Sequence, residues 1–277
     1  QTISDIKESH LFMQSKKDSF SKKLDLESFF LLIKPDNNIY YDNIKKRIIY
    51  GEIEKLKTLG LKNLEISWSN NKNWLDFVYK IKLNFPTINL GSASILNKKS
   101  IDDSLSIGLK YSMMKFWDKD LFNYAKAKKH LLIPGIKNLK DLKEAIKLNC
   151  NIIKIYPITS KDTSIDLSHY KNIDFIAAGG LSVNDLKYYQ SVGYKTIVIG
   201  DQAFKNNKLD PSIYEFLKEQ FQSLGCEVRG VTTQHGPITK WLEDRKCILN
   251  YVTMNSDPEF KIVDEYIAKG VELIKTT

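Results

Sequence analysis

The stretch FFLLIKPDNNIYYDNIKKRIIYGEIEKLKTLGLKNLEIS, residues 29–67, contains two short apolar runs separated by a longer amphipathic segment. The runs Phe29–Ile33 and Lys62–Ser67 have the length and apolar content of strands. The segment between them ends at Gly60, which suits a left-handed cap after a helix. Its apolar side chains recur at helical spacing along one face: Ile44, Ile48, Ile49, Ile53 and Leu56. The stretch is therefore predicted to form a strand–helix–strand unit.

The same alternation of strand and helix continues toward the C-terminus and predicts eight such units. Eight parallel strands with intervening helices favour an α/β fold of the (β/α)8 TIM barrel type over an open doubly wound sheet. No GxGxxG follows the first strand and no GxxxxGK[ST] occurs, so a dinucleotide or P-loop nucleotide site is not indicated. The predicted strands are Phe29–Ile33, Lys62–Ser67, Thr87–Ser92, Lys110–Met114, Leu131–Pro134, Asn151–Tyr156, Ile173–Ala177 and Thr196–Gly200.

Three regions are expected along the chain. Residues 1–27 form an N-terminal helical segment, residues 28–224 the barrel, and residues 225–277 a C-terminal extension of different composition. The extension is predicted to hold two strands, around Glu227–Thr233 and Cys247–Met254, and then a helix from about Lys261. About fifty residues are marginal for independent stability, so the extension is expected to pack on the barrel or on another subunit.

Composition excludes several classes of protein. The chain has 277 residues, and its net charge of +9 comes from 42 Lys and Arg against 33 Asp and Glu. Only three of those cations are arginine and the lysines are scattered, so a nucleic-acid surface is not indicated. No apolar run is long enough to span a membrane, and no secretory signal is evident, so we expect a cytoplasmic protein without a membrane partner. The cysteines are expected to be reduced thiols: Cys150, Cys226 and Cys247.

A carboxylate and an ammonium group are predicted to share the barrel interior. Strand alternation turns Lys154 inward in NIIKIYP, residues 151–157, and Glu65 inward in KNLEISW, residues 62–68. Burial lowers the pKa of a lysine toward the range in which its neutral amine can attack a carbonyl. A nearby carboxyl group can then move protons during imine formation. A structural ion pair is the alternative interpretation of these two residues.

Six segments, including those of Glu65 and Lys154, carry a resemblance to a known family that covers about residues 25–220. They are GLKNLEISW, INLGSASILN, LLIPGIKN, IIKIYP, FIAAGGLS and TIVIGDQAF. In this order and spacing the chain resembles the KDPG/KHG aldolases, class I enzymes that release pyruvate from 2-keto-3-deoxy-6-phosphogluconate or 4-hydroxy-2-oxoglutarate. The resemblance implies Lys154 as the Schiff-base lysine and Glu65 as general acid and base. It further implies a keto-acid substrate, a homotrimer, and no metal or other cofactor. Histidine spacing also gives no metal motif.

The resemblance also implies where the substrate is held. It places the following residues at the substrate: Ser94, Ser69, Pro134, Gly179, Gly180, Gly200 and Asp201. Ser69 stands where the family has the arginine that receives the pyruvate carboxylate, and residues 114–116 replace the SPG segment of the family with Met-Lys-Phe. Ala178 replaces a threonine before the paired glycines, and Asp201 is unfavourable beside a phosphate if it faces the pocket.

These departures leave two alternatives to the aldolase hypothesis. One is a non-catalytic or substrate-altered barrel that serves as a binding module, with Lys154 and Glu65 kept as a structural pair. The other is a different phosphate-binding TIM-barrel enzyme, for which the glycine turn after the seventh strand suffices and the lysine is not needed.

Overall fold

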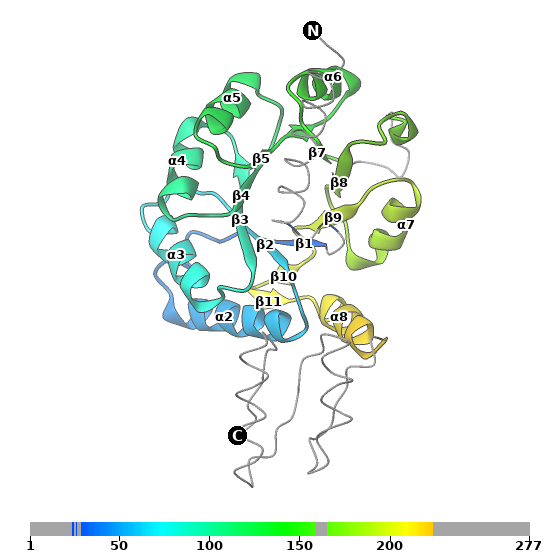
Figure 1. The fold of residues 1–277 in the computed structure, drawn as a ribbon. Coiled ribbons are helices and arrows are strands. Elements are labelled where there is room, and N and C mark those ends of the chain that lie inside the picture. The colour runs from blue at the N-terminus through cyan, green and yellow to red at the C-terminus, as the bar shows by residue number, and fades with distance from the viewer. Residues whose placement is uncertain (1–23, 25, 27–28, 159–164, 224–277) are drawn as a thin grey trace, which may run out of the picture. The chain divides into compact units, whose positions relative to one another are not determined.

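The computed structural model describes residues 24, 26, 29–158 and 165–223 (Figure 1). The chain divides into two compact units, residues 1–57 with 61–210 and residues 58–60 with 211–277. Most of the predicted N-terminal segment and the whole predicted C-terminal extension lie outside the described residues, as do Cys226 and Cys247. In the second unit the described part is mainly helix α8, Pro211–Ser223.

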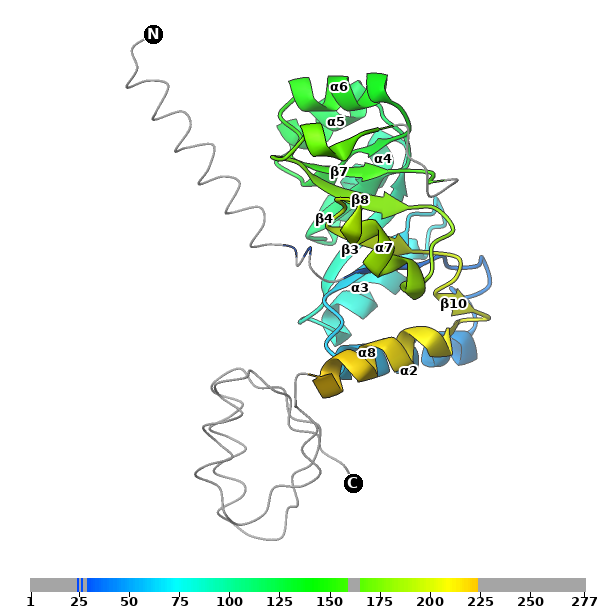
Figure 2. The ribbon, with the colours of Figure 1, turned by 90° about the vertical axis from the view of Figure 1, so that its right-hand side faces the viewer.

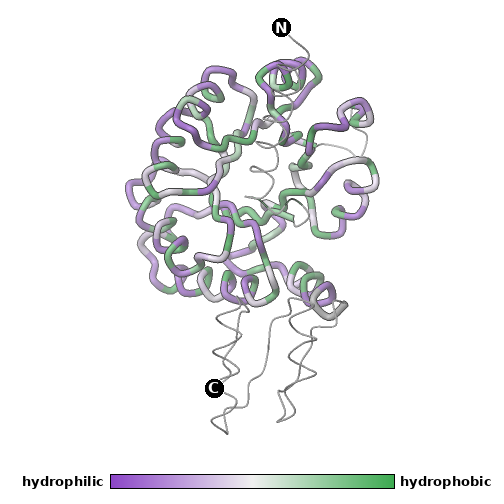
Figure 3. Tube along the Cα trace, viewed as in Figure 1, coloured by the Kyte–Doolittle hydropathy of each residue, from purple (hydrophilic) through white to green (hydrophobic). Residues whose placement is uncertain are grey.

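The first unit is a barrel of parallel strands with helices outside it, as predicted (Figure 1). Its sheet has the order β5-β4-β3-β2-β1-β9-β8-β7-β6. Figure 3 shows hydrophobic segments along these strands and mixed colouring along the surrounding helices. The strands are β1 Phe30–Ile33, β2 Asn63–Ser67, β3 Asn89–Ile95, β4 Tyr111–Met114, β5 Leu132–Ile133, β6 Gly135–Ile136, β7 Ile152–Ile155, β8 Asp174–Ala178 and β9 Thr196–Ile199.

The barrel closes through Pro134. The strand predicted at Leu131–Pro134 is divided into β5, which pairs with β4, and β6, which pairs with β7. Proline has no backbone N–H to donate, so the ladder is interrupted where the chain passes from one neighbour to the other. Because β5 and β6 are the two ends of the sheet order, this single residue joins them and the eight predicted strand positions form a ring.

Helices follow most of the strands. Three of them begin at a side-chain cap, in which Asn97, Asp118 or Asn138 accepts a hydrogen bond from the backbone N–H three residues later. Between β7 and β8 the described residues contain one short 3-10 helix, η1, Leu167–His169. The helices are α2 Asn43–Thr58, α3 Trp74–Asn84, α4 Lys98–Ser106, α5 Lys119–Ala127, α6 Leu139–Lys147 and α7 Leu186–Ser191, the last preceded by η2, Val183–Asp185. Figure 2 shows the same elements from the side, turned by 90° about the vertical axis.

The buried face predicted for helix α2 is confirmed for most of its length. Ile49, Ile53 and Leu56 are buried, and Gly60 has a φ of +82°, the left-handed conformation expected after the helix. Ile44 was predicted on the same face but is 69% exposed. It lies in the first turn of the helix, so the buried face begins one turn later than the pattern indicated.

Side chains from alternate strand positions, together with two leucines that precede β1, fill the barrel interior. This interior cluster consists of Leu24, Leu26, Phe30, Tyr111, Met113, Ile133, Ile152, Ile176, Ala178 and Val198. The intervening residues face outward, and Ile95, Met114 and Leu132 pack with α4 and α5 in a second cluster. The two rows identify the direction of each strand residue, and they place the polar side chains described next.

After β9 the chain forms a small hairpin before α8. Strand β10, Phe204–Lys205, pairs antiparallel with β11, Lys208–Leu209. Asn206 and Asn207 between them both have positive φ, +51° and +63°, as a two-residue type I′ hairpin turn requires.

Candidate functional site

The structure places Glu65 and Lys154 inside the barrel, as their sequence positions predicted. Glu65 lies in the middle of β2 and is 1% exposed, and Lys154 lies in β7 and is 6% exposed. The neighbours of Lys154 in the inward row are Ile152, which belongs to the interior cluster, and Tyr156, which packs against it. Both ionisable groups are therefore removed from bulk water.

Burial moves both groups toward their neutral forms. It raises the pKa of the Glu65 carboxyl to about 8, and the charge of Lys154 opposes this. It lowers the pKa of the Lys154 ammonium to about 8, opposed by Glu65 and assisted by the positive charge of Lys115. Oε1 of Glu65 has no hydrogen-bond partner among the described residues. A neutral amine and a neutral carboxylic acid in one interior are a nucleophile and a proton donor.

Tyr111 lies beside Glu65 and was not identified from the sequence. Its hydroxyl donates a hydrogen bond to the backbone oxygen of Leu64 at 3.3 Å, and burial together with the charge of Glu65 raises its pKa. The ring occupies space left by Gly91, which is in register with Glu65: a Cβ on Gly91 would lie 2.4 Å from Cζ of Tyr111. The signal in the sequence was the glycine in the predicted third strand opposite a large residue in the fourth.

The mouth of the barrel, which is the end where its parallel strands finish, carries two hydroxyl groups from neighbouring strands. Ser67 at the end of β2 donates a hydrogen bond to Ser94 in β3, with 2.9 Å between the oxygens. Ser94 has a φ of +60°, which is uncommon for a residue with a side chain. It lies where the register between β3 and β4 shifts, between Ser92 and Ile95. Such an irregularity redirects a side chain, and here it brings Ser94 to Ser67.

The backbone of Pro134 helps to position Lys154. Its carbonyl oxygen accepts a hydrogen bond from the N–H of Lys154 at 2.9 Å and so fixes the strand that carries the amine. The next residue, Gly135, is in register with Lys154. A Cβ on Gly135 would lie 2.5 Å from the carbonyl oxygen of Met114, so only glycine fits there.

The paired glycines follow β8. Gly179 has a φ of +128°, and a Cβ on it would lie 2.8 Å from the backbone nitrogen of Ile158. That N–H donates to the carbonyl of Ala178 at 2.8 Å, so the glycine permits close contact between two backbone segments. Gly180, with a φ of +65°, has open space where its side chain would be.

Two predicted substrate residues, Gly200 and Asp201, directly follow β9, and one of them forms an ion pair. Asp201 is exposed and forms an ion pair of 2.5 Å with Lys34, which follows β1. A Cβ on Gly200 would lie 3.5 Å from Cδ2 of Leu32 and 3.9 Å from Cε of Lys34, an ordinary packing distance. The carboxylate of Asp201 is thus accompanied by a cation at this edge of the barrel.

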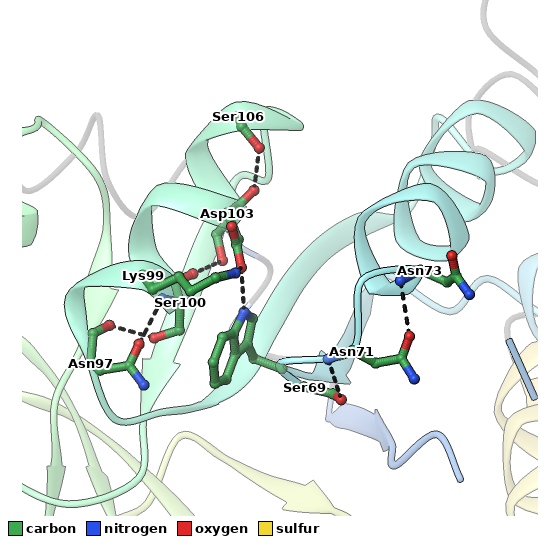
Figure 4. A network of polar contacts seen from close by, with 10 residues as sticks. Ser69, Asn71, Asn73, Asn97, Lys99, Ser100, Asp103 and Ser106 are labelled. Carbon is green, nitrogen blue, oxygen red and sulfur yellow. Dashed lines mark hydrogen bonds and ion pairs between the residues drawn. The ribbon is translucent and has the colours of Figure 1, made fainter. Parts of the chain in front are cut away.

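Ser69 is placed in the turn between β2 and α3. Its hydroxyl accepts a hydrogen bond from the backbone N–H of Asn71 at 3.2 Å (Figure 4). The adjacent Trp68 donates to Asp103 of α4 at 2.9 Å and so lies on the helix side of its strand. The hydrogen bond of Ser69 thus organises a turn, and the position carries no positive charge.

The described residues contain no group of three or more His, Cys, Asp or Glu side chains arranged to hold a metal ion. His130 is buried and contacts Ser112, whereas His169 is exposed and pairs with Asp166. Trp117 donates to Glu144 at 2.9 Å and belongs to the packing around α5. Cys150 is a buried free thiol. None of the helices described is long and apolar enough to cross a membrane.

Comparison with protein-family models gives one match for this chain. A family model described as "KDPG and KHG aldolase" matches residues 41–215. The 2-keto-3-deoxy-6-phosphogluconate aldolase of Zymomonas mobilis ATCC 29191 is 20% identical and covers 72% of this chain and 94% of its own, with a TM-score of 0.58.

A second solved structure is the KDPG aldolase of Legionella pneumophila, with pyruvate captured at low pH as a covalent carbinolamine intermediate. It is 15% identical and covers 70% of this chain and 92% of its own, with a TM-score of 0.56. At these identities the two structures support the fold. A search of curated proteins gives no match.

Proposed function

The chain belongs to the KDPG and KHG aldolase family, and on that premise we propose that it is a class I aldolase in which Lys154 forms the Schiff base. The substrate is a 2-keto-3-deoxy acid or a 4-hydroxy-2-oxo acid, of the KDPG or 4-hydroxy-2-oxoglutarate type. Cleavage releases pyruvate and an aldehyde. The observation that carries the proposal is the burial of Lys154 together with Glu65, which favours the neutral form of each.

Imine formation uses both groups. The neutral amine of Lys154 attacks C2 of the keto acid, and a proton passes from the attacking nitrogen to the carbonyl oxygen to give a neutral carbinolamine. Protonated Glu65 then donates a proton to the hydroxyl group, which leaves as water, and the nitrogen is left as a protonated imine. Glu65 ends this step as a carboxylate, and the positive charge on the imine nitrogen partly compensates its burial.

Carbon–carbon cleavage follows from the same arrangement. The Glu65 carboxylate takes the proton of the C4 hydroxyl, the bond between C3 and C4 breaks, and its electron pair moves into the iminium to form an enamine. The aldehyde leaves, protonated Glu65 returns a proton to C3, and water hydrolyses the imine to pyruvate and free Lys154. The protonated imine acts as the electron sink, and water is the only further reactant that the cycle needs.

The remaining residues belong to the proposed binding surface. Ser94 with Ser67 offers hydroxyl groups at the mouth, and Pro134 holds the strand of the amine through its carbonyl. The turns containing Gly179, Gly180, Gly200 and Asp201 are proposed to receive the far end of the substrate. By family membership we further propose a homotrimer that works in the cytoplasm.

Trapping with borohydride tests the proposal. The protein is incubated with pyruvate, reduced with borohydride, and mapped by mass spectrometry of its peptides. We expect a reduced pyruvyl adduct on Lys154 in the wild type and none in Lys154→Met. Lys110→Met is the matched control, because Lys110 is an exposed lysine bonded to Asn89 before β4. Absence of an adduct at high pyruvate in the folded wild type would reject the Schiff-base mechanism and favour a binding module.

A further inference from the structure

Lys115 is the first residue after β4 and lies in a bend at the end of that strand. Tyr111 and Met113 belong to the interior cluster, whereas Met114 packs outward with α4 and α5. Lys115 is partly buried, and its Nζ lies over the ring of Phe116, which contacts Tyr156 of the inward row of β7. Its N–H donates to the carbonyl of Ile95 at 3.1 Å, so the backbone of Lys115 remains bonded to the end of β3. Lys115 therefore lies at the mouth of the barrel, two residues after Met113.

Only a glycine separates the backbone of Lys115 from the strand of Lys154. A Cβ on Gly135 would lie 2.6 Å from the carbonyl oxygen of Lys115, and Gly135 is in register with Lys154. Two strand spacings amount to about 10 Å between the backbones of the two lysines. Because Gly135 has no side chain, that position adds none between the two lysines, which leaves room for a small molecule to contact both ammonium groups.

An aromatic wall connects the two lysines. Nζ of Lys154 lies 5.6 Å from the centroid of the Tyr156 ring, and the Tyr156 and Phe116 rings lie 5.9 Å apart. Nζ of Lys115 lies 5.4 Å from the centroid of the Phe116 ring. Both cations therefore lie against the same wall, and the positive charge of Lys115 is felt at Lys154, where it favours the neutral amine.

The charge of Lys115 is available for a ligand. No ion pair with a carboxylate is found for it in the described part of the chain, whereas Lys34, another lysine at a strand end, is bonded to Asp201. Ser69 supplies no cation to the site and its hydroxyl accepts from Asn71. A 2-keto acid brings a carboxylate adjacent to the reacting carbon, and burying that charge without a partner is unfavourable.

We propose that Lys115 is the specificity residue that receives the C1 carboxylate of the keto acid while Lys154 attacks C2. Lys115 reaches the carboxylate from the next strand but one, along the wall of Phe116 and Tyr156. The inference rests on the proposed Schiff-base function and adds to it the group that distinguishes a keto acid from a neutral ketone.

The test compares pyruvate with methyl pyruvate, which carries the same reacting carbonyl without the carboxylate charge. Borohydride trapping is measured over a range of each ketone in the wild type, Lys115→Met, Lys115→Arg and the control Lys110→Met. Charge-assisted hydrogen bonds to a carboxylate lead us to expect a half-saturating pyruvate concentration about 10- to 100-fold higher in Lys115→Met. For methyl pyruvate the change should be much smaller. Lys115→Arg should keep most of the preference for pyruvate, and Lys110→Met all of it.

The outcomes separate the two proposals. Lys115→Met that traps both ketones as the wild type does, or that weakens both to the same extent, would overturn the role of Lys115 as carboxylate receptor and leave the Schiff base intact. Wild-type protein that traps neither ketone would overturn the proposed function itself. Thermal melting of each variant, followed by circular dichroism, shows that the proteins being compared are folded.

Discussion

The ring of Tyr111 occupies the space that a side chain at Gly91 would fill. Three ring atoms lie 2.4, 2.5 and 2.7 Å from the position of a Cβ on Gly91, and Tyr111 is fully buried. Phe30 holds the ring in place from another side, with the two centroids 5.7 Å apart in an edge contact. Because Gly91 and Glu65 are in register on adjacent strands, this packing lies next to the strand position that carries Glu65.

Gly91→Ala is expected to destabilise the barrel by about 1–3 kcal/mol, because a rigid, enclosed ring must move to admit one methyl group. Urea denaturation measures the change. The same substitution at Gly51, a helix position in α2 with nothing within 4 Å of its Cβ, should stabilise by about 0.5–1 kcal/mol. A shorter residue at position 111 should reduce the penalty, so Gly91→Ala in a Tyr111→Leu background should be less costly. Equal penalties in both backgrounds would contradict the contact.

The parts of the site that sequence reasoning predicted depend on strand alternation. That period, applied to residues 62–68 and 151–157, was enough to turn Glu65 and Lys154 inward. It failed where the backbone departs from a regular strand: the positive φ of Ser94 accompanies a register shift, and Pro134 divides one predicted strand into two. Neither departure could be predicted from the alternation of inward and outward side chains, because that alternation assumes a regular strand.

Other features required contacts between segments that are distant in the sequence. The packing of Tyr111 depends on Gly91, which lies on a neighbouring strand. The proposed role of Lys115 depends on its position close to Gly135 and to the aromatic wall of Phe116 and Tyr156. The sequence identified residues 114–116 as altered and cationic, but it gave no direction for the lysine. That direction follows from the contact of Lys115 with the Phe116 ring and of Phe116 with Tyr156.

Lys154→Met should abolish imine trapping and leave the fold stable. With no hydrogen-bond partner on Oε1 and a pKa raised to about 8, Glu65 can remain a neutral acid near pH 7 when the lysine is removed. We expect a free energy of unfolding within about 1 kcal/mol of the wild type, because methionine fills a similar volume without a charge. A structural ion pair predicts instead a loss of about 3–5 kcal/mol. Urea denaturation at neutral pH distinguishes the two.

The rate of imine formation should have a maximum near pH 8. The pKa of Lys154 is lowered to about 8, so the reactive amine increases as the pH rises through that value. The pKa of Glu65 is raised to about 8, so the proton donor is lost over the same interval. In Glu65→Gln the falling limb should disappear and the rising limb should move to lower pH, because the charge that raises the pKa of Lys154 is gone.

The same variant should also form the imine about 10²- to 10⁴-fold more slowly, since glutamine cannot donate the proton. Initial rates of trapping at saturating pyruvate, measured from about pH 6 to about pH 10, test both effects. The control Lys110→Met should keep the wild-type profile. A Glu65→Gln profile with both limbs of the wild type would show that another group supplies the proton.

The burial of His130, which lies at the end of a chain of hydroxyl groups, is expected to make stability depend on pH below neutrality. Ser104, Ser92 and Ser112 are joined by contacts of 2.7 Å, and Ser112 contacts Nε2 of His130 at 2.7 Å. Burial lowers the pKa of His130 from 6.5 to about 4. Between these values the unfolded chain binds a proton that the folded protein does not, so stability falls as the pH falls from about 6.5 to about 4.

His130→Gln should remove this contribution. Between pH 7 and pH 5 the wild type should lose about 2 kcal/mol more free energy of unfolding than the variant, as follows from titration of one group with this shift. Urea denaturation at the two pH values measures the difference. His169→Gln is the matched control, and since that side chain is 76% exposed it should leave the pH dependence of the wild type in place. If His130→Gln lost as much stability on acidification as the wild type, the acid sensitivity would have to come from the carboxyl groups.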